Sequence, residues 1–297
     1  MKLLLACLAA SAIPTVAARP WAQQASGTTY FFTFGNSYTQ TGFSTTGEQP
    51  STSNPMGNPA LGTGTTTGGL NWVGYLTTEQ NSSLVLNYNL AIGGATIDDS
   101  LVASYQGDLV SEIGMFNATY RSKPESAAWT SDDAVFAFWI GVNDIGNAFY
   151  KTDAGTFIPQ LMDRLRSLAQ AIISAGGRKF LFLNVPPTSR SPFFIDQGNA
   201  TVAQQAAYLK VYNDQLRSMV TALGANNTGV TAVLYDSWSF MTAVLDNPVQ
   251  YGFQDATCIN EDGVTCVWWN NYHPSAKYHQ LQAANMTSVL APLGAWE

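Results

Sequence analysis

Four groups spaced along this chain could act on a substrate: a serine hydroxyl, the N–H groups of a glycine pair, an asparagine amide and a histidine imidazole. They belong to Ser37, Gly94, Asn143 and His273. A serine just past a strand can present its hydroxyl beside backbone N–H groups, and an amide can donate to a substrate oxygen. Taken singly, these residues also fit ordinary turns and caps. Their meaning depends on whether the fold brings them together.

Two familiar loop motifs are missing around these residues. Ser37 follows Gly35, whose freedom allows a sharp turn, but no G-x-S-x-G stands here or elsewhere, so an α/β-hydrolase is not supported. Gly93-Gly94 follows a strand-like run, but G-x-G-x-x-G is absent, so a dinucleotide-binding loop is not supported either.

The predicted secondary structure alternates between strands and helices. Short apolar runs typical of buried strands are Thr29–Phe34, Leu84–Ile92, Ala134–Ile140, Lys179–Val185 and Thr231–Tyr235. Helical patterns between them are Asn71–Glu79, Ile97–Tyr120, Thr156–Ala175, Ala200–Leu223, Ser237–Leu245 and Ser275–Leu290. This alternation predicts an α/β fold, namely a three-layer α/β/α sandwich with a five-stranded parallel sheet.

The candidate groups fall where such a fold binds ligands. In open parallel sheets the active residues sit on loops beyond the carboxyl ends of the strands. Ser37, Gly94 and Asn143 each follow a predicted strand, and His273 precedes the last predicted helix. The polar stretch Thr45–Gly69 is expected to be a long loop that forms part of the rim of the site.

In this order, the four residues resemble the four blocks of the SGNH (GDSL-type) hydrolase superfamily, which contribute Ser, Gly, Asn and His. The resemblance spans essentially the whole chain after residue 18. Three features are also similar to the secreted fungal acetylesterases of carbohydrate esterase family 16. They are the run GNSYT at 35–39, Asn184-Val185-Pro186-Pro187, and the Trp-rich segment before His273-Pro274. The resemblance implies a flavodoxin-like SGNH hydrolase fold.

The resemblance also implies a mechanism. Ser37 would be the nucleophile that attacks an ester carbonyl, and His273 the general base and then acid. The Ser37 N–H, the Gly94 N–H and the Asn143 side-chain amide would form the oxyanion hole. Trp268 and Trp269 border the histidine, and one of them is expected to line the site.

Two positions depart from the family pattern. Asn36 stands where the family has an Asp before the serine, and Asn270 stands where it has the Asp that orients the histidine. An amide oxygen can still accept from the imidazole, but an amide can also present its NH₂ and favour the wrong tautomer. The Asp-to-Asn replacement in a serine protease costs about 10⁴ in rate.

The sequence leaves three explanations of Asn270 open. The amide, or a nearby backbone carbonyl, could orient His273 and leave an active enzyme. A carboxylate from the cysteine loop, Asp262 or Asp255, could take its place. The protein could also be a weak or inactive sugar-binding relative.

Composition limits the partners. The chain has 297 residues, a formal charge of −7, no run of Lys or Arg, two histidines and three cysteines. The acidic balance argues against nucleic acid, and we expect no metal site, no cofactor and a monomer. The second histidine, His279, lies mid-helix and is expected to pack or to face water.

The first residues resemble a secretory signal. A basic start, an apolar run and Val16-Ala17-Ala18 predict a signal peptide over residues 1–18, followed by one domain over 19–297. No other stretch is apolar enough to cross a membrane. In an extracellular protein the remaining cysteines, Cys258 and Cys266, are expected to form a disulfide. The N-x-S/T sequons are Asn81, Asn117, Asn199, Asn226 and Asn285.

These observations give three hypotheses. By resemblance, the first is a secreted serine esterase that cleaves short-chain, acetyl, esters of plant cell-wall oligosaccharides. The second is a lipolytic GDSL esterase acting on lipid esters, although no extended apolar lid helix is apparent. The third is the catalytically silent sugar-binding relative.

Overall fold

The computed structural model describes residues 27–296. Its strands are β1 (Thr28–Gly35), β2 (Leu84–Asn89), β3 (Ala134–Trp139), β4 (Lys179–Leu183) and β5 (Thr231–Tyr235). Its α-helices are α1 (Trp72–Thr78), α2 (Leu109–Thr119), α3 (Val142–Ala148), α4 (Ala154–Ala175), α5 (Pro192–Ile195), α6 (Asn199–Asn226), α7 (Ser237–Asp246) and α8 (Ala276–Leu290). The predicted signal peptide, residues 1–18, lies outside the described residues.

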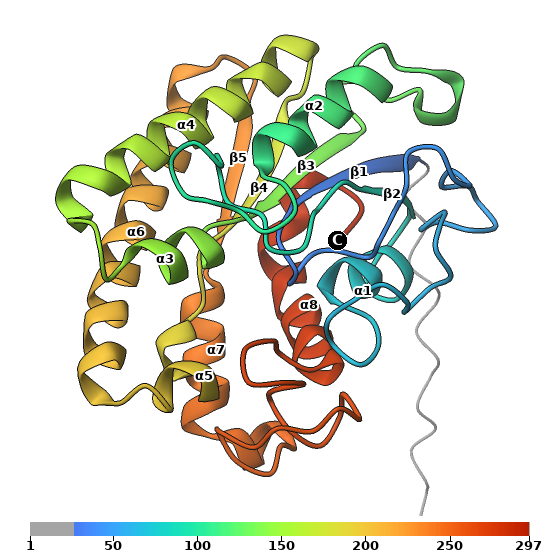
Figure 1. The fold of residues 1–297 in the computed structure, drawn as a ribbon. Coiled ribbons are helices and arrows are strands. Elements are labelled where there is room, and N and C mark those ends of the chain that lie inside the picture. Colours follow the sequence, from blue (N-terminus) through green and yellow to red (C-terminus); the bar gives the residue numbers. More distant parts are fainter. Residues whose placement is uncertain (1–26, 297) are drawn as a thin grey trace, which may run out of the picture.

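The strands form one parallel sheet in the order β2-β1-β3-β4-β5. Helices α1 and α8 pack together on one face, and α2, α4 and α6 cover the other (Figure 1). This is the three-layer α/β/α sandwich with a five-stranded parallel sheet that the sequence predicts.

Stacked aromatic rings hold the middle of the sheet. The register pairs Phe32 with Phe136 and Phe136 with Phe180, and adjacent ring centroids are 5.2 and 5.8 Å apart. A second row of stacked rings lies two residues further along the same strands. It consists of Phe34, Phe138 and Phe182, whose adjacent ring centroids are 4.9 and 5.1 Å apart. Such offset rings add to the energy of burial, and they fix strand register where the active loops begin.

The predicted helix Ile97–Tyr120 is wrong in its first half. Residues 97–108 form a loop, and α2 begins only at Leu109. Short polar side chains bond the local backbone instead: Asp98 accepts from the Ser100 N–H and Asp99 from the Ser104 N–H. This competition is the usual reason why Asp and Ser disfavour helix interiors. Strand β2 also ends at Asn89, earlier than predicted.

Two short helices were not expected from the pattern, namely α3 and α5. Each is too short to show a helical period in sequence. Helix α3 begins directly after β3, so Asn143 lies in its first turn and not in an open loop.

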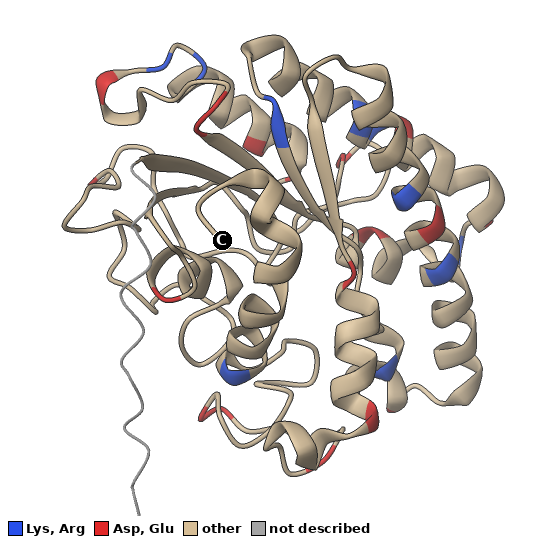
Figure 2. Ribbon diagram, turned by 180° about the vertical axis from the view of Figure 1, so that it is seen from behind, with Lys and Arg blue, Asp and Glu red and all other residues tan. Residues whose placement is uncertain are grey.

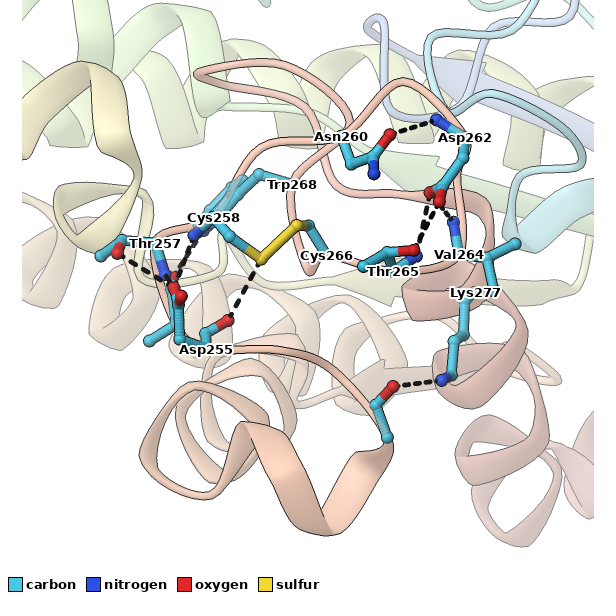
Figure 3. Close-up of a disulfide and its surroundings, with 12 residues drawn as sticks. Asp255, Thr257, Cys258, Asn260, Asp262, Val264, Thr265, Cys266, Trp268 and Lys277 are labelled. Carbon is cyan, nitrogen blue, oxygen red and sulfur yellow. Dashed lines mark hydrogen bonds between the residues drawn. A yellow bond between two sulfur atoms is a disulfide. The ribbon is translucent and has the colours of Figure 1, made fainter.

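A second, smaller core lies between α7, the disulfide loop and α8. Its members are Met241, Val244, Leu245, Phe253, Val267, Trp268 and Tyr278. The disulfide joins Cys258 to Cys266 in the loop beside this core (Figure 3). In Figure 2 the Lys and Arg positions are scattered over several elements, with no concentrated basic region among the residues described. No helix within 27–296 is long and apolar enough to span a membrane.

Candidate active site

Strand order brings three of the four candidate groups to one edge of the sheet. Strand β1 lies between β2 and β3, so the loop that carries Ser37 is flanked by the loop that carries Gly94 and by the first turn of α3, which carries Asn143. The turn out of β1 needs a glycine: Gly35 has φ +147°, and a Cβ there would lie 2.3 Å from the carbonyl oxygen of Trp139. Ser37 therefore leaves the strand sharply and stays at its end.

The fourth group arrives from the far end of the chain. His273 Nε2 lies 2.8 Å from Ser37 Oγ, although 236 positions separate the two residues. On the other side of the ring, His273 Nδ1 lies 3.0 Å from Asn270 Oδ1. Hydroxyl, imidazole and amide therefore form one continuous hydrogen-bonded line.

Two backbone N–H groups determine which way the Asn270 amide faces. Its Oδ1 accepts from the N–H of Tyr272 at 2.9 Å and from the N–H of His273 at 2.8 Å. An NH₂ in that position would oppose two donors, so the oxygen must face them. Nδ1 then carries the proton and donates to Oδ1, which leaves the Nε2 lone pair for the Ser37 hydroxyl. The tautomer that a base requires is set without a carboxylate.

The other orienting groups that the sequence left open are engaged elsewhere. Asp255 accepts from the N–H groups of Thr257 and Cys258, and Asp262 accepts from those of Val264 and Thr265 (Figure 3). These bonds belong to the turns of the disulfide loop. Nδ1 is bonded to the Asn270 side chain, not to a backbone carbonyl.

Burial keeps the imidazole neutral. Loss of solvent lowers the pKa of His273 from 6.5 to about 4. A charged carboxylate beside the ring would oppose this shift, and Asn270 supplies none. The ring is thus ready to accept a proton over the mildly acidic and neutral range.

The loop that carries Gly94 is hydrogen-bonded to the first turn of α3, which carries Asn143. Gly94 has φ +78°, and a Cβ on it would lie 2.7 Å from Cβ of Tyr105, so only glycine fits without displacement. Asn143 donates one Nδ2 hydrogen to the carbonyl of Ala95 at 2.8 Å. The second hydrogen of that amide remains for another acceptor.

The long loop and a buried tyrosine fix the serine and histidine relative to each other. Thr66 Oγ1 donates to the Ser37 carbonyl at 2.8 Å, and the Thr67 carbonyl accepts from the N–H of Ala276 at the start of α8. Tyr38, directly after the serine, donates its hydroxyl to the carbonyl of Tyr272, directly before the histidine. The loop predicted at Thr45–Gly69 therefore connects the backbone of Ser37 to the start of α8 through hydrogen bonds.

Sequence reasoning missed a buried glutamate that joins two of the loops. Glu112 of α2 is fully buried, and its oxygens accept from the N–H of Gly35 at 2.8 Å and of Ile92 at 3.0 Å. Desolvation raises the pKa of this carboxyl well above its usual range. The sequence does contain a sign of this residue. Glu112 follows Leu109 by three positions and precedes Phe116 by four, so it lies on the same core-facing side of the helix as these two apolar residues.

Asp144 has a similar place behind Asn143. It is buried, accepts from the N–H of Ile97 at 3.0 Å, and burial raises its pKa to about 7. Asn143 and Asp144 thus bond the same loop, at Ala95 and at Ile97. The pair holds the amide of Asn143 at the edge of the Gly94 loop.

Glu112→Gln is expected to lower kcat by about 10- to 100-fold while KM changes little. An amide can accept only one of the two N–H bonds, and displacement of the Ser37 turn by even about 1 Å can cost about 10² in rate. The measurement is steady-state hydrolysis of p-nitrophenyl acetate. Glu79→Gln, at an exposed position, is the matched control. An unchanged kcat in Glu112→Gln would show that this carboxylate does not position the site.

The structure also places His279 and the two tryptophans near the catalytic histidine candidate. His279 is buried against Tyr38 and Trp139, and burial, with a smaller effect of His273, lowers its pKa to about 3. Trp268 is fully buried, whereas Trp269 is partly exposed beside Gly68.

In the part of the chain that the structure describes, no group of three His, Cys, Asp or Glu side chains could hold a metal ion.

Known proteins resemble this chain over most of its length. The family model GDSL-like Lipase/Acylhydrolase matches residues 31–286. An acetylesterase of Thermothelomyces thermophilus is 42% identical over 261 residues, which cover 86% of each chain. An acetylesterase of Hypocrea jecorina is 27% identical over 324 residues, covering 90% of this chain and 91% of that one.

A solved structure shares the fold. It is described as a GDSL-like lipase from Parabacteroides merdae, with a TM-score of 0.52, 13% identity, and coverage of 89% of this chain and 95% of that chain. Family model, relatives and fold agree, so the protein is a carboxylic ester hydrolase of the GDSL type. The chain belongs to the GDSL-like lipase/acylhydrolase family.

Proposed function

We propose that this protein is a secreted serine esterase that hydrolyses acetyl esters of plant cell-wall oligosaccharides. The observation that carries the proposal is the line from Asn270 Oδ1 through His273 to Ser37 Oγ, at 3.0 and 2.8 Å. The names of the two fungal relatives support the acetyl group.

The reaction would follow the acyl-enzyme route. Ser37 Oγ attacks the ester carbonyl while His273 Nε2 takes its proton. The N–H groups of Ser37 and Gly94 and the free amide hydrogen of Asn143 receive the negative oxygen. His273 then gives the proton to the departing alcohol, and water, activated by the same ring, releases the acid.

The orientation of Asn270 favours an active enzyme over a silent relative. The concern raised by the missing Asp is the wrong tautomer, and the N–H groups of Tyr272 and His273 act against that tautomer. What the amide lacks is charge to stabilise the imidazolium. The proposal therefore includes a catalytic base of unusually low pKa.

The location is also a proposal. We infer that cleavage after Ala18 releases the domain 19–297 as a monomer. Asn199, Asn226 and Asn285 are exposed and therefore suit glycan attachment best, whereas Asn81 and Asn117 are partly buried.

A chain-length series tests this proposal. The wild type should hydrolyse p-nitrophenyl acetate with a kcat/KM about tenfold or more above that for the octanoate, as expected of an esterase that selects the acetyl group. A preference for the octanoate would favour the lipolytic esterase. Hydrolysis no faster than that of Ser37→Ala would favour the silent sugar-binding protein.

A further inference from the structure

A pocket between α3, α5 and the loop before His273 lies directly beside the catalytic line. Its volume is about 330 Å³, near the lower end of the range for ligand pockets. We call it the α3–α5 pocket, and its lining residues are Asn143, Gly146, Asn147, Phe193, Phe194, Asn271 and Tyr272. Both short helices lie near α6 in Figure 1, on the side of β3 that faces β4.

The pocket is lined by one residue assigned to the oxyanion hole and by one residue next to the proposed base. Asn143 is the amide assigned to the oxyanion, and Tyr272 directly precedes His273. In ester cleavage the departing alcohol must take its proton from His273 Nε2. Ser37 and His273 do not themselves line the pocket, but the ring centroid of Tyr272 lies 5.8 Å from that of His273, so a group bound between Asn143 and Tyr272 lies next to the imidazole.

The lining carries no charged side chain. It consists of three asparagines, two phenylalanines, a tyrosine and a glycine. A phosphate or a carboxylate would find no opposite charge here and would lose hydration without compensation. Amides and aromatic rings suit a ligand with hydroxyl groups on its rim and an apolar face, which describes an uncharged sugar ring.

The side chains that would make these contacts are available. Phe193 is 43% exposed, although its ring packs 5.1 Å from that of Phe194 and 5.5 Å from that of Tyr272. The Asn271 side chain is exposed and makes no hydrogen bond within residues 27–296. Asn147 makes only a 3.4 Å bond, to the carbonyl of Ala103. The pocket therefore offers a ligand both an exposed aromatic ring and amide groups that are free to form hydrogen bonds.

We propose that the α3–α5 pocket binds the uncharged sugar ring that carries the acetyl ester. Phe193 packs against the ring face, and the amides of Asn147 and Asn271 bond its hydroxyls. The volume is sufficient for one sugar ring, and the proposal assigns it to the unit that carries the acetyl group. This inference rests on the proposed esterase activity and adds the basis of its selectivity.

The test compares a sugar ester with an ester that has no sugar. The variants are Phe193→Ala and Asn271→Ala, and the substrates are acetylated xylo-oligosaccharides and ethyl acetate, whose alcohol part is too small to fill the pocket. Each variant should lose roughly tenfold in kcat/KM on the sugar ester, through KM, and change less than about twofold on ethyl acetate. Ile195→Ala is the matched control, because Ile195 lies on the same helix and is 42% exposed but does not line the pocket.

The outcomes separate this inference from the proposed function. Equal losses on both substrates, no loss on either, or the same split in Ile195→Ala would each overturn the pocket assignment while leaving the esterase intact. A wild type that hydrolyses p-nitrophenyl acetate no faster than Ser37→Ala would overturn the proposed function first. A selective loss in both variants supports the assignment.

Discussion

Ser37→Ala should reduce hydrolysis of p-nitrophenyl acetate by about 10⁶-fold in kcat, the size of loss seen when a serine hydrolase loses its nucleophile or its base. The physical reason is that no other hydroxyl lies within hydrogen-bonding distance of His273 Nε2 among the residues described. His273→Ala should lose about as much, and the double variant little more, because the two side chains act as a unit. The measurement is initial rate at matched protein concentration.

Folding must be separated from chemistry in this comparison. Ser37 is partly exposed and its side chain bonds only the imidazole, so the melting temperature of Ser37→Ala should stay close to that of the wild type. Ser218→Ala, on the exposed face of α6, is the matched control and should keep full activity. A Ser37→Ala variant with more than about one hundredth of wild-type kcat would contradict the assignment of the nucleophile.

Asn270→Ala should give the next largest loss after Ser37→Ala and His273→Ala, below the about 3 × 10⁴ found when a charged orienting residue is removed. Without Oδ1 the imidazole has no fixed tautomer, and the N–H groups of Tyr272 and His273 lose their acceptor. The loss should appear in kcat more than in KM. Activity close to wild type would show that another group orients the ring.

Asn270→Asp is the informative companion, because it changes charge at nearly constant shape. Catalysis needs the neutral imidazole, so wild-type kcat/KM should be flat above about pH 5 and fall as pH drops through the His273 pKa of about 4. An adjacent carboxylate favours the imidazolium and raises that pKa, so the acid limb of the variant should move to higher pH. Asn260→Asp, on the exposed disulfide loop, adds the same charge away from the ring and should leave the limb in place.

These pH profiles suggest what the asparagine does for the enzyme. With Asp at this position the transition state gains a counter-charge, but the base becomes protonated at a higher pH. With Asn it loses the counter-charge and remains a base in more acidic surroundings. If kcat/KM of Asn270→Asp falls at the same acidic pH as that of the wild type, the idea that Asn270 lowers the rate but widens the active pH range is wrong.

The sequence predicted the scaffold because its signals are local. Apolar runs such as Ala134–Ile140 bury both faces of a strand, and five of them alternating with helices leave little choice of architecture. The strand order then places Ser37 between Gly94 and Asn143. The long strands and helices agree with the prediction. Residues 97–108 form a loop and not the predicted helix, because hydrogen bonds between their side chains and the backbone cannot be recognised from the spacing of apolar residues.

The details of the site depend on contacts that no pattern displays. The direction of the Asn270 amide is set by two N–H groups in its own turn, and those point inward only after the turn has formed. Glu112 lies 77 positions from Gly35 and 20 from Ile92, so its role in joining them appears only in three dimensions. The sequence could name candidate reacting groups and Asn270 as one possible orienting group, but it gave no indication of the role of Glu112.

The most direct test of the account is labelling with a fluorophosphonate, which reacts with serine hydroxyls only when a base activates them. The account predicts one label per molecule on the peptide that contains Ser37, in step with the loss of esterase activity, and none in His273→Ala. Complete inactivation with Ser37 unlabelled, or labelling of Ser37 that persists without His273, would contradict it.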